Sequence, residues 1–148
     1  MEDEKTALVV HTFEKVMNSY LATEKRPHDY GVGFSLYRSE IHTIDVVGRQ
    51  EQINITELAQ TLGVTKSAAS QMIDRLVKKG LVVKTILTKS DTEVALTLTT
   101  VGQKVFRAHQ ESHRMFFSYI KETLSTVSDC DISAFLDIME KLSAFIDL

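Results

Sequence analysis

The sequence predicts a mainly α-helical fold with one small β-hairpin. Apolar residues recur at helical spacing over most of the 148 residues, and only the region 81–98 is rich in Val, Ile and Thr around a polar turn. Hydrophobic residues make up 43% and charged residues 25% of the chain, which is an ordinary globular composition. At this length we expect one domain, or a domain with an appended dimerisation element.

Composition also bears on the cellular location of the protein. No run of about 18 apolar residues occurs, so we expect no membrane span. The first residues, MEDEKTALVV, lack the basic segment and long apolar stretch of a signal peptide. Cys130 is the only cysteine and fits a reducing cytosol. Because flanking aspartates disfavour the reactive thiolate, we expect a structural or incidental cysteine in a cytoplasmic protein.

The first third of the chain predicts two helices separated by a loop. Apolar spacing predicts helices over 4–23 and 34–48. Segment 25–33 holds the only proline and two glycines, which is typical of a loop. The second helix would turn four apolar residues to one side: Phe34, Tyr37, Ile41 and Ile44. A polar break and a short strand over 53–55 are expected to follow.

Two further helices joined by a tight turn are predicted before residue 80. Thr56 is expected to cap the first of them, which Gly63 ends. Thr65 or Lys66 opens the second, and Gly80 is expected just past its end. The buried stripe of this second helix would contain Ala69, Met72, Ile73, Leu76 and Val77.

The remaining chain predicts a β-hairpin and two helices. Segments 81–87 and 93–98 flank the polar turn 88–92, as expected for a hairpin. A long helix is expected over 100–124. A last helix follows the turn at 125–129.

Charge is concentrated in one region of this acidic chain. Six lysines and arginines against two acids give residues 56–89 a charge of +4, whereas the whole chain carries −3 and the remainder therefore −7. A basic segment in an acidic protein is typical of a localised nucleic-acid contact.

The helix pair of this basic segment predicts DNA binding. A short helix, a tight turn and a second helix with small polar groups outside form a helix-turn-helix, and the major groove admits one such helix. Ser67, Ala68, Gln71 and Arg75 share one helical face. Gln71 suits adenine and Ala68 suits a thymine methyl group. Phosphate contacts are expected from Thr65, Lys66, Ser70, Lys78, Lys84 and Lys89.

Residues 55–106 resemble the MarR family of bacterial transcription regulators. The resemblance rests on ITELAQTLGVTKSAASQMIDRLVKKGLV, on an aspartate in the hairpin, and on LTTVG opening the long helix. The order of the other helices extends it over essentially the whole chain. It implies a winged helix-turn-helix DNA-binding domain at 34–102 and a helical dimerisation region at 1–33 and 103–148.

That resemblance also implies a function. Family members are homodimers with intertwined first and last helices that bind a palindromic operator in double-stranded DNA, usually as repressors, and release it on a ligand signal. The family usually has Asp-Arg-Arg at the wing tip, whereas this chain has Asp91-Thr92-Glu93. Because the arginine that enters the minor groove is absent, we expect weaker or differently shaped DNA readout.

Apolar stripes on the first and last helices independently predict a homodimer. An exposed patch of that size would be unusual on a monomer, where the largest is typically about 300–600 Å². Pairing two copies would bury both stripes and set two recognition helices roughly 34–36 Å apart, one turn of DNA. The alternative is that both helices pack against the winged helix of their own chain.

Histidines suggest an effector site, with three interpretations left open. His109 and His113 are four residues apart on one helix, the spacing by which two imidazoles bind one zinc ion. The zinc-responsive branch of the family uses a Glu–His–His–His set, which Glu24, His42, His109 and His113 resemble in type and position. The histidines could instead line a pocket for an organic ligand, or be purely structural.

The sequence does not predict an enzyme. It contains no nucleophile elbow, glycine-rich phosphate loop or recognisable acid–base pair. The competing hypothesis is a winged-helix protein-interaction module with weak or no DNA binding, which the missing wing arginine and the acidic remainder of the chain favour.

Overall fold

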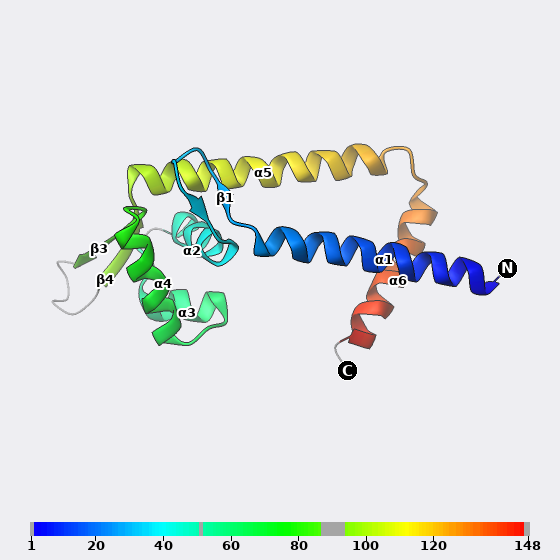
Figure 1. The fold of residues 1–148 in the computed structure, drawn as a ribbon, viewed down its shortest axis with the longest axis horizontal. Helices are drawn as coiled ribbons and strands as arrows, with labels where there is room; N and C mark the ends of the chain where they lie inside the picture. Colours follow the sequence, from blue (N-terminus) through cyan, green and yellow to red (C-terminus); the bar gives the residue numbers. More distant parts are fainter. Residues whose placement is uncertain (1, 51, 87–93, 147–148) are drawn as a thin grey trace. The chain divides into compact units, whose positions relative to one another are not determined.

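A computed structural model of the chain describes residues 2–50, 52–86 and 94–146 (Figure 1). Contacts divide the chain into two compact units, one ending at His109 and one beginning at Gln110. The elements are, in chain order, α1 (Glu2–Lys25), β1 (His28–Asp29), β2 (Ser35–Leu36), α2 (Arg38–Arg49), α3 (Ile55–Leu62), α4 (Lys66–Lys78), β3 (Val82–Ile86), β4 (Val94–Leu98), α5 (Thr100–Leu124) and α6 (Asp129–Ile146). The predicted fold class, mainly helical with one winged hairpin, is confirmed.

The segment between α1 and α2, predicted as a loop, contains two short paired strands. β1 and β2 pair antiparallel, with His28 opposite Leu36. The Asp29 carboxylate supports the turn by accepting hydrogen bonds from the backbone N–H groups of Gly31 and Val32, at 2.9 and 3.1 Å. Aspartate side chains commonly stabilise turns by accepting hydrogen bonds from the backbone two or three residues further on.

The second helix begins later than predicted, so its predicted start at residue 34 is wrong. Because Ser35 and Leu36 belong to β2, α2 begins at Arg38 instead of residue 34. Ile41 and Ile44 are buried as predicted, but the side chain of Tyr37 is 55% exposed. Tyr37 lies at the cap position, before the helical spacing begins.

Asn54, not the predicted Thr56, caps α3. Its Oδ1 accepts hydrogen bonds from the N–H groups of Thr56 and Glu57 at 2.9 and 3.0 Å. Glu57 returns a hydrogen bond by accepting from the Asn54 N–H, which completes a capping box. The short strand expected over 53–55 is a single bridge between Ile53 and Leu96. Gly63 ends α3 at φ 65°, as predicted.

Both ends of α4 agree with the sequence. The Thr65 hydroxyl accepts a hydrogen bond from the Ala68 N–H at 3.2 Å. At the other end, Gly80 has φ 69°, and the Leu81 N–H donates to the Leu76 carbonyl at 2.9 Å. This is the Schellman arrangement that a glycine at this position favours.

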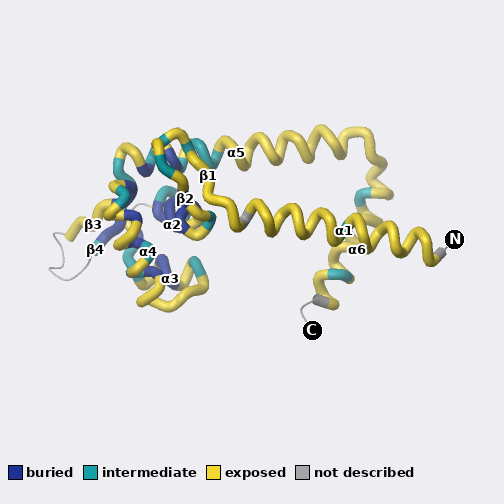
Figure 2. Tube along the Cα trace, viewed as in Figure 1, coloured by how far each residue is buried: buried dark blue, intermediate teal, exposed yellow. Residues whose placement is uncertain are grey.

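The hydrophobic core belongs to the winged helix. Figure 2 shows buried residues in α2, α3, α4, β3, β4 and the start of α5, whereas α1 and α6 are drawn as mostly exposed. Of the stripe predicted for α4, Ala69, Ile73 and Leu76 are buried, Met72 is half-buried and Val77 is 38% exposed. The orientation of α4 is therefore fixed by its buried side.

The hairpin and the last two helices follow the predictions closely. β3 pairs antiparallel with β4, from Val82 opposite Leu98 to Ile86 opposite Val94. The predicted turn 88–92 lies outside the described residues. α5 has the predicted bounds, and Cys130 is exposed at the start of α6. Over the ranges that the structure describes, no helix is both long and apolar enough to cross a membrane.

We predict that Gly102→Ala destabilises the protein. A Cβ atom at Gly102 would overlap the backbone carbonyl of Leu81, which already accepts a hydrogen bond from the Thr99 N–H. Because backbone atoms cannot yield as a flexible side chain does, we expect a loss of about 2 kcal/mol or more in urea denaturation. Lys104→Ala, an exposed change on the same helix, is the control. Equal denaturation midpoints for the two variants would contradict this packing.

Candidate nucleic-acid interface

The predicted contact residues of α4 lie on one outward surface. Ala69, Ile73 and Leu76 face the core, so the opposite side of the helix is left to solvent. Seven of the eight predicted residues on this helix and its cap are exposed, and Ser70 is half-buried; the exposed seven are Thr65, Lys66, Ser67, Ala68, Gln71, Arg75 and Lys78. The helix therefore presents hydroxyl, amide and cationic groups together, as a major-groove element requires.

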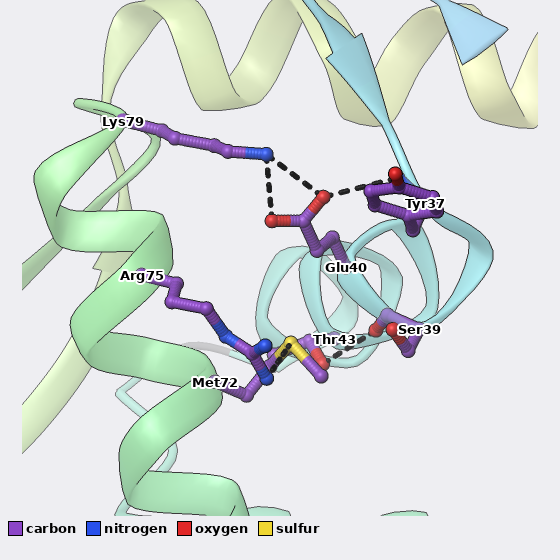
Figure 3. A network of polar contacts seen from close by, with 7 residues as sticks. All are labelled: Tyr37, Ser39, Glu40, Thr43, Met72, Arg75 and Lys79. Atoms are coloured by element: carbon purple, nitrogen blue, oxygen red, sulfur yellow. Dashed lines mark hydrogen bonds and ion pairs between the residues drawn. The ribbon is translucent and has the colours of Figure 1, made fainter. Parts of the chain in front are cut away.

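Arg75 takes a different direction from the one expected of a base-reading residue. Figure 3 shows its side chain extending from α4 toward α2. Its guanidinium lies 3.7 Å from the sulfur of Met72. Within the described ranges no carboxylate pairs with it, so its charge is available to an external anion.

Lys84 pairs with an acid of α4. Its Nζ lies 2.6 Å from Oδ1 of Asp74. The Lys84 hydrogen bond, followed by its charge and that of Lys78, holds the pKa of Asp74 below its usual value. Asp74 is exposed and lies three residues after Gln71, so it places a negative charge beside the predicted DNA-reading face. Lys89, the other predicted wing contact, lies outside the described residues.

A buried ion pair that the sequence did not reveal joins α2 to α4. The Glu40 side chain is only 6% exposed, and its Oε1 lies 2.7 Å from Nζ of Lys79. Oε2 accepts hydrogen bonds from Lys79 at 2.9 Å and from the Tyr37 backbone N–H at 3.0 Å. The Lys79 ammonium also lies 5.9 Å from the centre of the Phe34 ring. Figure 3 shows the pair bridging the two helices. Glu40 lies in the first turn of α2, but its partner Lys79 is 39 residues away in the sequence, so local patterns do not predict the pair.

An open groove of about 1020 Å³ lies beside this ion pair. We call it the α2–α4 groove, since its lining comes from the first turns of α2 and the last turns of α4. The lining residues are Tyr37, Arg38, Ser39, Glu40, His42, Arg75, Lys78 and Lys79. Four lysines and arginines thus surround one carboxylate.

Arg38 connects this groove to α1 and to the histidines. It donates hydrogen bonds to the Tyr20 hydroxyl at 2.6 Å and, through Nε–H, to Nε2 of His42 at 3.1 Å. Its guanidinium also lies 5.1 Å from the centre of the Tyr20 ring. His42 and His109 are neighbours, with ring centres 6.4 Å apart, and Tyr30 contacts His109 edge-on at 6.1 Å.

Within the first unit, two described members of the predicted zinc set, His42 and His109, lie close together. The side chain of Glu24 lies outside the described residues, and His113 belongs to the second unit. In the parts of the chain that are described, no three His, Cys, Asp or Glu side chains are grouped to hold a metal. The Arg38 guanidinium also donates a hydrogen bond to His42 Nε2, one of the two ring nitrogens that could bind a metal. The zinc set therefore stays a prediction.

Comparisons with known proteins agree with this geometry. A sequence model described as "MarR family" matches residues 34–90. The Bacillus subtilis HTH-type transcriptional regulator YhjH is 31% identical over 113 residues, which are 73% of this chain and 65% of YhjH. The chain thus spans slightly less than two thirds of that relative.

Two solved structures share the fold. FabT of Streptococcus pneumoniae, solved in complex with DNA, matches with a TM-score of 0.71 and 20% identity over 96% of this chain and 97% of FabT. ZitR of Lactococcus lactis, a zinc-responsive MarR family member, matches with a TM-score of 0.68 and 16% identity over 90% of this chain and 97% of ZitR. At these identities the likeness shows the fold alone.

The curated relative is a transcriptional regulator and not an enzyme, in agreement with the sequence. The helix-turn-helix, its wing and the exposed polar side of α4 lie within or next to the matched segment 34–90. The resemblance inferred from the sequence is confirmed: residues 34–90 match the MarR family model, and the chain is similar to HTH-type transcriptional regulators.

Proposed function

We propose that this protein is a DNA-binding transcriptional regulator that places α4 in the major groove. The observation that carries the proposal is the two-sided character of α4, whose apolar side is locked in the core while its other side offers hydrogen-bonding groups to solvent. A helix held in this way keeps its base-reading side chains in a fixed register.

Different residues of α4 have different proposed roles. Gln71 reads adenine through its amide, and Ala68 contacts a thymine methyl group. Thr65, Lys66 and Lys78 contact phosphates, which position the helix without reading sequence. Lys84 reaches phosphate only by leaving Asp74, so its contribution is smaller than the sequence suggested.

We further propose that the protein acts as a homodimer on a palindromic operator, as a repressor. Apolar side chains are exposed on each of α1, α5 and α6, including Leu8 at 66%, Phe117 at 71% and Phe145 at 74%. Surfaces of this kind are typical of protein interfaces. A second copy would cover them and present two α4 helices to successive turns of DNA.

An effector completes the proposed function. Its binding near the boundary of the DNA-binding and dimerisation regions would favour one spacing of the two α4 helices. The effector can change operator occupancy only by its difference in affinity between the states. A protein-interaction module that ignores DNA is the competing outcome, and the acid on α4 is the observation that favours it.

We predict that Gln71→Ala and Lys78→Ala weaken DNA binding in different ways. Loss of the Gln71 amide should cost about 1–3 kcal/mol at one base pair and relax the preference there. Loss of the Lys78 charge should weaken all sequences alike and lower the slope of log K against log salt by about 1. Selection of bound oligonucleotides and salt titrations measure the two effects. Identical behaviour of both variants would refute these roles.

We predict that Asp74→Asn tightens DNA binding. The change removes a negative charge beside the reading face and frees Lys84 from its 2.6 Å partner. One added phosphate contact should raise affinity severalfold at low salt and steepen the salt dependence by about 0.9. Asp45→Asn on α2, which loses an acid paired with Arg49, is the matched control. Weaker binding by the Asp74 variant in fluorescence anisotropy would contradict the placement of α4.

We predict that Phe117→Ser combined with Phe145→Ser weakens self-association. Both rings are more than 70% exposed and would be buried by a second copy. Truncating two such aromatic anchors should raise the dimer dissociation constant by about two orders of magnitude in analytical ultracentrifugation. Ile86→Ser, a change of an apolar residue on β3 that is 64% exposed, should leave the dimer dissociation constant unaltered. A wild-type chain that stays monomeric would exclude the dimer.

A further inference from the structure

We propose that Thr99 is a positioning residue for DNA recognition, whose hydroxyl fixes the direction of the recognition helix α4 relative to α5. The proposal rests on the proposed function, since it assumes that α4 binds DNA and that α5 contributes to a dimer. It goes beyond that function by naming the residue through which the protein discriminates between operators of different half-site spacing. The contacts involve Gly80, Leu81, Thr99 and Gly102, which we call the α4–α5 joint.

Thr99 uses its single hydroxyl in two elements. Its Oγ1 donates a hydrogen bond to the Gly80 carbonyl at 2.6 Å. The same oxygen accepts a hydrogen bond from the Gly102 N–H, in the first turn of α5, at 3.0 Å. Because Thr99 directly precedes α5, this second bond is an ordinary N-cap. The first bond is not needed for capping and leads to another part of the fold.

The Gly80 carbonyl belongs to the end of the recognition helix. Gly80 has φ 69°, and the Leu81 N–H closes the last turn of α4 by donating to the Leu76 carbonyl at 2.9 Å. Figure 1 shows this end of α4 next to the start of α5. Gln71 lies roughly 13 Å farther back along the helix, at about 1.5 Å per residue. A small change of direction at Gly80 therefore moves the Gln71 side chain more than it moves the joint.

Backbone contacts leave little space within the joint. The Leu81 carbonyl accepts a hydrogen bond from the Thr99 N–H at 3.0 Å. A Cβ atom placed on Gly102 would overlap the same carbonyl oxygen, so the two backbones meet without a side chain between them. Leu81 itself is fully buried. The two segments are therefore close enough for one hydroxyl to bridge them.

Directionality makes the hydroxyl bond decisive for the orientation of α4. Apolar burial contributes more free energy, but hydrophobic contact has no preferred direction and tolerates small rotations. A hydrogen bond weakens steeply when its angle falls below about 120°. The Glu40–Lys79 pair holds the same end of α4 through a long lysine side chain, whereas Thr99 bonds directly to the Gly80 backbone. The core thus sets where α4 lies, and Thr99 limits how far its end tilts from α5.

In a dimer, the direction of α4 relative to α5 would set the spacing of the two recognition helices. α5 is one helix from Thr100 to Leu124, and it exposes Phe117, which we propose to meet a second copy. Adding one base pair between two half-sites moves the second by about 3.4 Å and turns it by about 35° around the duplex. In a symmetric dimer, both joints must change to follow it. A stiff joint therefore produces a strong preference for one spacing.

The test uses duplexes derived from one selected sequence. Oligonucleotides bound by the wild-type chain are selected from a random pool. Fluorescence anisotropy then compares the selected operator, the same operator with one central base pair added or removed, and a single half-site. The measured quantity is the spacing ratio, which is the dissociation constant of the altered operator divided by that of the selected one. Because a change of protein charge affects both constants alike, the ratio reports geometry.

Three variants of Thr99 separate positioning from capping. Thr99→Val removes both hydroxyl bonds, whereas Thr99→Asp keeps an acceptor for the Gly102 N–H but cannot donate to the Gly80 carbonyl. We expect both to lower the spacing ratio at least about fivefold, the typical weight of one hydrogen bond, and Thr99→Val to bind the half-site within about twofold of the wild type. Thr99→Ser keeps the hydroxyl and should retain the wild-type ratio.

Thr43→Val is the matched control. The Thr43 hydroxyl also donates to a carbonyl, that of Ser39 at 2.8 Å, but this bond closes within α2. Thr43 is fully buried, so the same replacement is made in the interior without touching the joint, and the spacing ratio should equal that of the wild type.

Three outcomes overturn the proposal. The first is an unchanged spacing ratio in folded Thr99→Val or Thr99→Asp protein. The second is an equal decrease in Thr43→Val or Thr99→Ser. The third is an equal loss of affinity by Thr99→Val for the half-site and the whole operator, because Thr99 would then act on base reading and not on spacing.

Thermal unfolding shows whether each variant is folded. If Thr99→Val does not fold, Thr99→Asp, which keeps the cap, provides the comparison with Thr99→Ser. A wild-type chain that binds no duplex of the pool at low salt overturns the proposed function and this inference together. A wild-type chain that binds operators of all three spacings equally well overturns the inference alone.

Discussion

The buried apolar side of α4 sets the placement of this helix, and the ion pair between Glu40 and Lys79 ties its end to α2. Glu40 is almost completely buried, so removing Lys79 would leave an uncompensated charge in the interior. Breaking such a pair typically costs about 3–5 kcal/mol, and the partial exposure of Lys79 puts this one toward the lower end. The same carboxylate accepts from the Tyr37 N–H, and Lys79 directly precedes the glycine that ends α4. One interaction therefore links the start of α2 to the end of α4.

The exposed side of α4 has two parts with different chemistry. Its first turns carry Ser67, Ala68 and Gln71, which offer short side chains to a base edge. Its last turns carry Arg75 and Lys78, which also line the α2–α4 groove.

Most elements set by local signals could be predicted from the sequence, although the local Asn54 cap of α3 was missed, whereas elements set by distant partners could not. Gly63, Thr65 and Gly80 end or cap helices through their own backbone preferences, and the structure has them as predicted. The start of α2 was missed because Ser35 and Leu36 pair with a strand on the far side of a turn. The candidate site also combines features that local spacing predicts with features that depend on distant residues. Helical spacing places the face of α4, but the Asp74–Lys84 pair and the direction of Arg75 depend on other elements.

The environment of His42 bears on the class of effector. Arg38 donates to His42 Nε2, so this nitrogen acts as an acceptor and faces a permanent positive charge at 3.1 Å. A divalent cation brought to the same imidazole would have to displace Arg38 and then face the other cations of the groove. Among the described residues that line the groove, Glu40 is the one carboxylate, and Lys79 already pairs with it. The described positive charges at the start of α2 therefore act against a divalent cation at Nε2 of His42, while the four-residue spacing of His109 and His113 still suits one.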